Sequence, residues 1–219
     1  MLTLYGVYRS RASRQLWLLG EVGVGFRHIS VIHSDRLAQP NATGAPLNTA
    51  SPEFLAVSPI GQVPILEENG LVLSESLAIA LYIARRHGGM LGPQTEAETA
   101  LMEQWALFAA TSVEGPVRDI FNTVEIGGSA TQAGQAGIAQ AAEKLRRPLG
   151  HLQHVLDRHP FLVSDRFTVA DINAAECMRY AQAHPALLAE YPSVQDWLQR
   201  CQSRPAFRAM WQRHEAEVD

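Results

Sequence analysis

The sequence predicts an α+β protein with two domains, a mixed α/β domain over residues 1–89 and an all-helical bundle over residues 96–219. Before residue 90, short apolar runs typical of strands alternate with segments whose apolar residues recur at helical spacing, in the order β-α-β-α-β-β-α. After residue 95 we find only helical spacing. Residues 90–95, which include Gly92-Pro93, separate the two patterns and are the predicted linker.

Composition and charge are those of an ordinary globular protein. The 219 residues are 47% hydrophobic and 18% charged, with a formal net charge of -4. This acidic balance argues against nucleic acid or an anionic membrane as a partner, and no apolar run approaches the roughly 18 residues that cross a bilayer. The first residues lack the basic and apolar regions of a secretion signal. With only two cysteines, Cys177 and Cys201, both in helix-patterned segments, we expect a cytoplasmic protein with buried free thiols.

The chain opens as a β-α-β unit. Residues 2–5 form a short apolar strand, residues 16–22 carry apolar side chains at helical spacing with the helix end expected at Gly23 or Gly25, and residues 26–32 read as a second strand. Residues 33–50 hold two prolines, a glycine and several Asn and Thr residues. We predict a loop there, long enough to suggest a functional role.

A short helix is predicted after this loop. Ser51-Pro52-Glu53 has the pattern of a helix start, with Ser51 as the cap and Pro52 at the first helical position. The helix should end near Val57 and lead directly into residues 59–76.

Residues 59–76 read as a strand, a tight hairpin, a second strand and the first turn of a helix. Asn69-Gly70 between two apolar runs is typical of a two-residue hairpin. Because Pro64 cannot donate to a strand ladder, it belongs at the start of the first strand. A cis Val63–Pro64 bond would leave Val63 with a free peptide edge.

The segment Ser74-Glu75-Ser76 opens an apolar, helix-spaced run that extends to Arg86 and stops at His87-Gly88-Gly89. Small hydroxyls and unsatisfied N–H groups at a positive helix end suit a carboxylate. A free peptide edge beside a carboxylate pocket predicts a site for a small acidic peptide.

The second domain is predicted as helices alone. Residues 96–122 form one long helical pattern, bent or broken near Gly115-Pro116. Residues 127–137, rich in Gly and Ala, are predicted as a loop or a loosely formed helix end. Leucines between residues 145 and 156 form the stripe of a core-facing helix, with a kink expected at Pro148. Residues 168–171 have the pattern of a capping box.

Several of these motifs together resemble the glutathione transferase family. Gly61-Gln62-Val63-Pro64, followed ten residues later by Ser74-Glu75-Ser76-Leu77-Ala78-Ile79, is similar to that family's glutathione-binding half. The 168–171 cap and the stretches around Tyr191-Pro192 and Arg204-Pro205 resemble its C-terminal helices. The resemblance extends from Leu2 to about Trp211. It implies a thioredoxin-like first domain, glutathione as co-substrate without any further cofactor, and a homodimer.

The chemistry that the resemblance implies is activation of a thiol. A free thiol has a pKa of about 8.5, and the thiolate is the nucleophile. Three hydroxyls near the first helix compete for the activating role: Ser10, Ser13 and Tyr5. We favour Ser10, because it resembles the active serine of the theta, zeta and tau classes and has arginines on both sides. A simple helix cap also explains Ser10. No cysteine precedes residue 177, which disfavours a covalent disulfide-exchange mechanism.

Binding roles carry over from the resemblance to residues 62–64 and 75–76. Val63 would pair main chain to main chain with the cysteinyl unit, Pro64 would hold that edge open, and Glu75 and Ser76 would take the γ-glutamyl end. Gln62 stands where many relatives carry lysine for the glycyl carboxylate. Because an amide binds an anion more weakly than lysine, His33 or Asn48 from the loop would help.

The function predicted from these residues is a glutathione transferase that adds the thiol to a small apolar electrophile. Candidate wall residues for that electrophile are Trp105, Phe108, Ser112 and Arg118. His151 and His154 have a metal-compatible spacing, but with no third ligand in view we expect no metal site. Two alternatives remain: a peroxidase or isomerase that uses the same glutathione site, and a non-catalytic interaction domain, as in some translation and scaffold proteins of this architecture.

Overall fold

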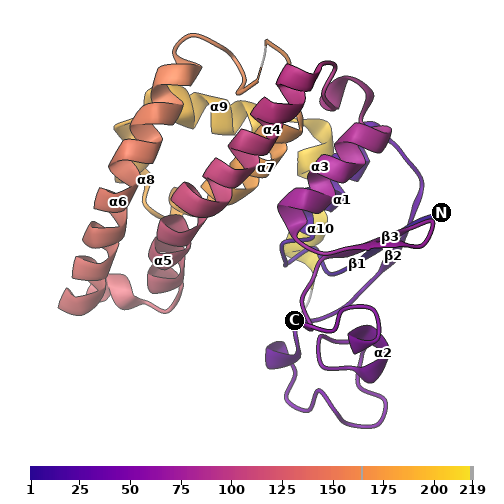
Figure 1. Ribbon diagram of the computed structural model, residues 1–219. Helices are drawn as coiled ribbons and strands as arrows, with labels where there is room; N and C mark the ends of the chain where they lie inside the picture. Colours follow the sequence, from indigo (N-terminus) through magenta and orange to yellow (C-terminus); the bar gives the residue numbers. More distant parts are fainter. Residues whose placement is uncertain (164, 218–219) are drawn as a thin grey trace. The chain divides into compact units, whose positions relative to one another are not determined.

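The structure of the protein is a computed structural model that describes residues 1–163 and 165–217 (Figure 1). The chain divides into two compact units. The first comprises Met1–Gly89 and the chain from Pro205 onward, and the second comprises Met90–Arg204. A mixed sheet with helices in the first unit and helices in the second confirm the predicted α+β class and the thioredoxin-like character of the N-terminal domain.

A four-stranded mixed sheet forms the centre of the first unit. Its strands are β1 (Leu2–Tyr5), β2 (Phe26–Ile29), β3 (Ile65–Glu68) and β4 (Leu71–Leu73), in the order β2-β1-β3-β4. Strand β1 is parallel to β2 and antiparallel to β3, and β3 is antiparallel to β4. The turn residues Asn69 and Gly70 both have positive φ, 52° and 85°, which is the backbone that this two-residue hairpin requires. The predicted hairpin is confirmed.

Four α-helices and a 3₁₀ turn complete the described part of this unit: α1 (Ser13–Val22), η1 (Ser34–Arg36), α2 (Pro52–Leu55), α3 (Ser76–His87) and α10 (Pro205–Ala216). Helices α1 and α3 lie on one face of the sheet and α2 on the other (Figure 1). Every residue of α1 from Ser13 to Leu19 is buried, because α3 and α10 both pack against it. The helix ends at Gly23, the first of the two glycines at which its end was expected, with φ 67°.

The position of α10 differs from the domain division expected from the sequence, which placed residues 96–219 in one helical domain. Helix α10 packs against α1. The rings of Trp17 and Phe207 meet edge to face with centroids 4.9 Å apart, and Gly20 faces Ala206. Helical periodicity identifies an apolar face but does not say which partner covers it.

The second unit consists, among its described residues, of helices and irregular segments without strands. Its helices are α4 (Glu96–Phe108), α5 (Glu114–Glu125), α6 (Gln132–Leu156), α7 (Val169–Met178), α8 (Pro185–Ala189) and α9 (Pro192–Gln202). Shorter turns are η2 (Gly89–Leu91), which spans the boundary of the units in the sequence, the π-helical η3 (Ala109–Val113), η4 (Gly128–Ala130) and η5 (Arg179–Ala183).

Helix α7 is the core of the second unit, since all ten of its residues are buried. Its predicted capping box is confirmed: the Thr168 side chain accepts from the first turn, and Asp171 accepts from the Thr168 N–H at 2.9 Å. Asp171 also accepts from Trp197 Nε1 at 3.0 Å, which ties α7 to α9. This carboxylate is therefore both a helix cap and a buried link between helices.

From the sequence we expected a bend or break near Gly115-Pro116, a loop or loosely formed helix end at residues 127–137, and a kink at Pro148. The break in the long 96–122 pattern is the π-helical turn at Ala109–Val113, just before Gly115-Pro116. Residues 127–131 form a turn that includes η4, and residues from Gln132 onward belong to α6, so the irregular part of the Gly- and Ala-rich stretch is shorter than predicted. Helix α6 continues through Pro148.

Both cysteines, Cys177 and Cys201, are buried thiols outside any disulfide, as predicted. Over residues 1–163 and 165–217, the structure has no helix that combines the length and the apolar character needed to span a bilayer.

Candidate functional site

Ser10 lies in the turn between β1 and α1, two residues before the N-cap Ala12. Its hydroxyl donates to the Val7 carbonyl at 2.7 Å and accepts from the Ala12 N–H at 3.1 Å, with 9% of the residue exposed. Ser10 therefore supports this turn and is not the helix cap that we had considered. The bond from Ala12 makes the hydroxyl a better donor, because an oxygen that accepts a hydrogen bond is polarised.

Gly6 brings Ser10 and Val63 together. A Cβ built on Gly6 would be 3.6 Å from Ser10 Oγ and 3.6 Å from Val63 Cβ, so these two atoms are at most twice that distance apart. Gly6 has φ 143°, a conformation that other residues rarely adopt. Two residues that the sequence assigned to one site thus face the same small region.

The peptide edge at Val63 has the predicted form. The Val63–Pro64 bond is cis. Strand β3 begins only at Ile65, opposite Tyr5, and over the described residues neither the N–H nor the C=O of Val63 has a hydrogen-bond partner. A main-chain donor and acceptor are thus left for an extended peptide.

Gln62 is exposed and its backbone is held by Ser58. The Ser58 hydroxyl donates to the Gln62 carbonyl at 3.1 Å, and the Gln62 N–H approaches the same hydroxyl at 3.3 Å. The buried Ser58, which the sequence reading did not single out, therefore shapes the loop before Val63.

Ser76 is the first residue of α3 and is buried against α1. Arg14 donates from Nη1 to the Ser76 hydroxyl, and the Gln15 side-chain amide donates to the Ser76 carbonyl. The Ser76 O–H has no acceptor among the described residues, so it can donate a hydrogen bond to a ligand. The sequence analysis named neither Arg14 nor Gln15. Arg14 is a cation one helical turn after Ser10, and this spacing could have pointed to it; both residues are buried in the first turn of α1.

Glu75 is exposed and has a strained backbone, with φ 66° and ψ 105°. For a residue with a side chain such a conformation costs about 1–3 kcal/mol and is typical of functional sites. Glu75 directly precedes Ser76, the first residue of α3, and its side chain makes no capping hydrogen bond to that helix.

Tyr5 and Ser13 do not share the geometry of Ser10. The Tyr5 hydroxyl donates to Glu67 Oε2 at 2.6 Å, and burial together with this bond raises the pKa of Tyr5. A phenol held in this way is not a source of phenolate at neutral pH. Ser13 is fully buried in the first turn of α1, where its N–H donates to the Ser10 carbonyl at 3.2 Å.

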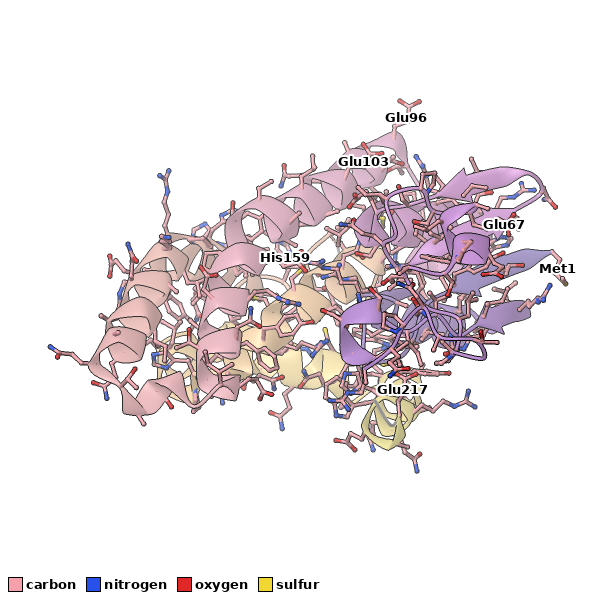
Figure 2. The ribbon with its side chains drawn as sticks, turned by 90° about the horizontal axis from the view of Figure 1, so that it is seen from below. Met1, Glu67, Glu96, Glu103, His159 and Glu217 are labelled. Carbon is pink, nitrogen blue, oxygen red and sulfur yellow. The ribbon has the colours of Figure 1, made fainter. Side chains whose placement is uncertain are left out.

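The C-terminal segment contributes to the same turn. The carboxylate of Glu217, labelled in Figure 2, accepts from the Tyr8 N–H at 3.0 Å and from the Arg9 N–H at 2.7 Å. These amides immediately precede Ser10. No feature of the sequence predicted this contact, because it joins residues 209 and 208 positions apart.

Asn48, one of two proposed helpers for the glycyl carboxylate, is fully buried and its side chain is occupied. Its amide donates to the Pro40 and Pro46 carbonyls, both at 2.9 Å, and its oxygen accepts from the Ala50 N–H at 2.9 Å. The expectation for Asn48 is therefore wrong, because a fully bonded, inaccessible amide cannot reach a ligand. His33 is half-buried in the same loop.

The residues suggested as walls for the electrophile belong to the second unit. Trp105 is buried, with Phe108 edge to face at 5.3 Å and His151 stacked at 5.3 Å. Arg118 lies over the Tyr180 ring at 5.2 Å. Aromatic packing thus explains His151, and no cluster of three potential metal ligands occurs among the described residues.

Sequence models of one family match most of the chain. The model described as glutathione S-transferase, N-terminal domain, matches residues 1–85, and the C-terminal domain model matches residues 99–205. Glutathione S-transferase 4 from Zea mays is 29% identical over 198 residues, which cover 89% of this chain and 84% of that protein.

Two further similar proteins differ in kind, one a glutathione transferase and the other an elongation factor. Glutathione transferase F7 from Populus trichocarpa has a TM-score of 0.80 at 28% identity, and the match covers 98% of this chain and 99% of the other. Elongation factor 1-gamma-B from Xenopus laevis is 34% identical over 169 residues, 75% of this chain but only 37% of that protein. The chain therefore spans little more than a third of that relative's length.

Proposed function

The chain belongs to the glutathione S-transferase family, and from that premise we propose that its first unit binds glutathione and activates the thiol for attack on a small apolar electrophile. One observation carries the proposal: the Ser10 hydroxyl and the unpaired peptide edge at Val63 converge beside Gly6. An extended tripeptide paired with Val63 would bring its central side chain toward this region. Ser10 would then donate to the sulfur.

Other groups of the site suit the two ends of glutathione. The Ser76 O–H and the first N–H groups of α3 would bind the γ-glutamyl carboxylate, with the Arg14 cation behind them. Glu75 would bind the α-amino group. The exposed Gln62 would contact the glycyl carboxylate at the other end.

The free-energy contributions of these groups predict a modest lowering of the thiol pKa. A hydrogen bond from Ser10 to a thiolate contributes about 1.5–3 kcal/mol and the start of α1 about 0.3–1 kcal/mol. Turning the O–H toward sulfur gives up the bond to Val7, worth about 0.5–1.5 kcal/mol. The difference of about 2 kcal/mol would lower the thiol pKa from about 8.5 to about 7. The thiol proton then passes to water, and the sulfur forms a new bond to the electrophile; with an aryl halide the carbon–halogen bond breaks and halide leaves.

A second function is supported by the elongation factor match. A glutathione transferase unit within a longer protein can serve as an interaction domain, and the relative from Xenopus laevis is such a longer protein. An interaction domain has no need of a polarised Ser10 hydroxyl beside a free Val63 edge, so we place it second.

Glutathione titration and turnover assays separate these functions. We expect saturable glutathione binding and conjugation of a reactive aryl halide, faster than reduction of an organic hydroperoxide. Binding without turnover on either compound would support the interaction domain, and no binding at millimolar glutathione would contradict both the transferase and the peroxidase readings. Light scattering would test the homodimer that belongs to the same proposal.

A further inference from the structure

Glu217 directly follows α10 and binds the turn that carries Ser10. Its two carboxylate oxygens accept from consecutive main-chain N–H groups, Oε1 from Tyr8 at 3.0 Å and Oε2 from Arg9 at 2.7 Å. Neighbouring N–H groups that converge on one anion form a backbone nest, and hydrogen bonds to a charged acceptor are roughly twice as strong as neutral ones. The contact therefore fixes the main chain of Tyr8 and Arg9 to the end of α10.

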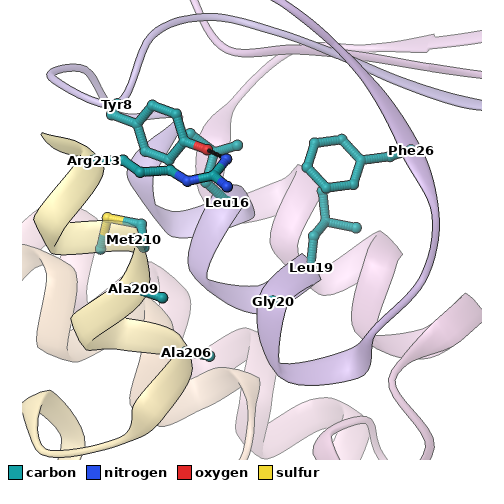
Figure 3. A pocket seen from close by; sticks show the side chains of 9 residues that line it. All are labelled: Tyr8, Leu16, Leu19, Gly20, Phe26, Ala206, Ala209, Met210 and Arg213. Carbon is teal, nitrogen blue, oxygen red and sulfur yellow. Dashed lines mark hydrogen bonds between the residues drawn. The ribbon is translucent and has the colours of Figure 1, made fainter. Parts of the chain in front are cut away.

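Tyr8 is held to α10 a second time, through its side chain. Arg213 Nη1 donates to the Tyr8 hydroxyl at 2.9 Å, and Figure 3 shows the two side chains against each other. The Tyr8 ring also meets the His28 ring edge to face with centroids 5.5 Å apart, and His28 Nε2 lies 2.8 Å from the Gly6 carbonyl oxygen. Arg213 precedes Glu217 by about one helical turn, so the end of α10 reaches both the side chain and the main chain of Tyr8.

The two residues that Glu217 holds lie inside the turn that Ser10 closes. The Ser10 hydroxyl donates to the Val7 carbonyl at 2.7 Å, with Tyr8 and Arg9 between the two bonded ends. In the proposed reaction this hydroxyl turns to the sulfur of glutathione and gives up its bond to Val7. The turn then loses its own closing bond at the step in which the position of the hydroxyl decides the thiol pKa. Bonds from another element are needed to keep the turn in shape.

We propose that Glu217 is a positioning residue for thiol activation: its carboxylate holds Tyr8 and Arg9 in place while Ser10 donates to the sulfur. This inference rests on the proposed function. A displacement of about 1 Å from the productive geometry can cost as much as 100-fold in rate, so the placement of this turn matters for turnover. A carboxylate accepts hydrogen bonds and does not donate them, so Glu217 influences the thiolate through the turn or through its charge.

The charge of Glu217 and its hydrogen bonds have opposite effects on the thiol. A carboxylate near a thiolate disfavours the anion, so removal of the charge alone would lower the thiol pKa. Loss of a well-placed Ser10 donor would raise it. The variant Glu217→Gln separates the two roles by the sign of the change, because the amide keeps the shape of the side chain but replaces one accepting oxygen with a donor.

The thiol pKa is measured from the ultraviolet absorbance of the thiolate as a function of pH, with the full chain saturated with glutathione. We expect Glu217→Gln to raise this pKa by roughly 0.5–1 and to lower kcat/KM for a reactive aryl halide by roughly three- to tenfold. Glu215→Gln removes a like charge from an exposed position on α10 and should change neither quantity. Amide hydrogen exchange at Tyr8 and Arg9 should become faster in Glu217→Gln and stay unchanged in Glu215→Gln.

A double-mutant cycle with Ser10→Ala shows whether Glu217 acts through that hydroxyl. In the Ser10→Ala background no hydroxyl remains to be positioned, so Glu217→Gln should cause no further rise in the thiol pKa and no further fall in kcat/KM. The inference is overturned if Glu217→Gln has equal effects with and without the Ser10 hydroxyl, or if in the parent it lowers the thiol pKa or leaves it unchanged.

The same measurements distinguish failure of this inference from failure of the proposed function. A parent protein that binds and turns over glutathione, beside a Glu217→Gln variant with the same thiol pKa and kcat/KM, would overturn the inference alone. A parent that does not bind glutathione would overturn the proposed function and the inference with it.

Discussion

Arg14 of α1 donates a hydrogen bond to the hydroxyl of Ser76, the first residue of α3, although the two are 62 positions apart in the sequence. Both residues are almost completely buried, with 2% and 6% of their surface exposed. The contact places a cation directly behind the helix end proposed to hold the γ-glutamyl carboxylate.

Ser76→Ala should therefore weaken glutathione binding more than Ser74→Ala, which removes an exposed hydroxyl two residues earlier. The loss of a carboxylate donor predicts a roughly tenfold increase in the Kd for glutathione. The buried Arg14 also loses a partner, which should cost about 1–3 kcal/mol of unfolding free energy. Titration and urea denaturation measure the two effects, and equal Kd values for the two alanine variants would contradict the assignment of Ser76.

Ser10→Ala should lower kcat/KM for an aryl halide by about 10- to 100-fold, because the thiolate loses one charge-assisted hydrogen bond. The apparent pKa in the pH profile of kcat/KM should rise toward that of the free thiol. Ser13→Ala is the matched control at the next helical turn. If Ser13→Ala gave the larger loss, or if Ser10→Ala left the pH profile unchanged, the activating hydroxyl would not be Ser10.

Tyr5→Phe should leave kcat/KM within about twofold of the parent, because the Tyr5 hydroxyl already donates to Glu67 at 2.6 Å and its raised pKa disfavours the phenolate. The lost hydrogen bond should cost about 1 kcal/mol of unfolding free energy. A large fall in turnover, with glutathione affinity retained, would return Tyr5 to the list of candidates for thiol activation.

Local patterns predicted the parts of the fold and site that depend on neighbouring residues. The Asn69-Gly70 hairpin and the Thr168 capping box both depend on local preferences over a few positions, and both are confirmed. Their reliability follows from physics, since φ > 0 in a tight turn or an accepting side chain at an N-cap is a requirement of the local geometry.

Local sequence patterns could not predict the contacts that complete the site, because these contacts join segments far apart in the chain. The bonds from Arg14 to Ser76 and from Arg9 to Glu217 depend on how α1 packs against α3 and α10. Asn48 shows the converse error. As a polar residue in a long loop it was predicted to face a ligand, yet three backbone partners hold it inside the loop.

Gly6→Ala tests the convergence beside Gly6 directly. The new Cβ would be 2.7 Å from the Ala12 Cβ, so the turn that carries Ser10 has to move, and the positive φ of 143° adds backbone strain. We expect a loss of about 1–3 kcal/mol in unfolding free energy and a marked loss of glutathione affinity. Gly23→Ala is the control, since Gly23 also has a positive φ, 67°, but a Cβ added there would have no neighbour within 4 Å. Equal effects of both variants on glutathione affinity would separate Gly6 from the site.

Asp171 should make the stability of the second unit depend on pH. Burial raises the pKa of Asp171 to about 6, against the hydrogen bonds from Trp197, Thr168 and Leu162 that lower it. A carboxyl whose pKa is higher in the folded than in the unfolded chain holds its proton more firmly when folded. Its stabilising contribution is complete below the unfolded value of 3.8 and is lost as pH rises through about 6.

Asp171→Asn cannot ionise and should not show this contribution. Relative to the variant, the parent should therefore lose unfolding free energy on the order of 3 kcal/mol between pH 4 and pH 7. The amide also replaces one of the two accepting oxygens, but that cost is the same at every pH. The slope of the difference is therefore the quantity to measure, by urea denaturation at a series of pH values. Asp196→Asn, an exposed position on α9, should give a flat difference. A parent that gains stability relative to Asp171→Asn as pH rises would show that the hydrogen bonds outweigh burial and that the carboxylate is ionised throughout.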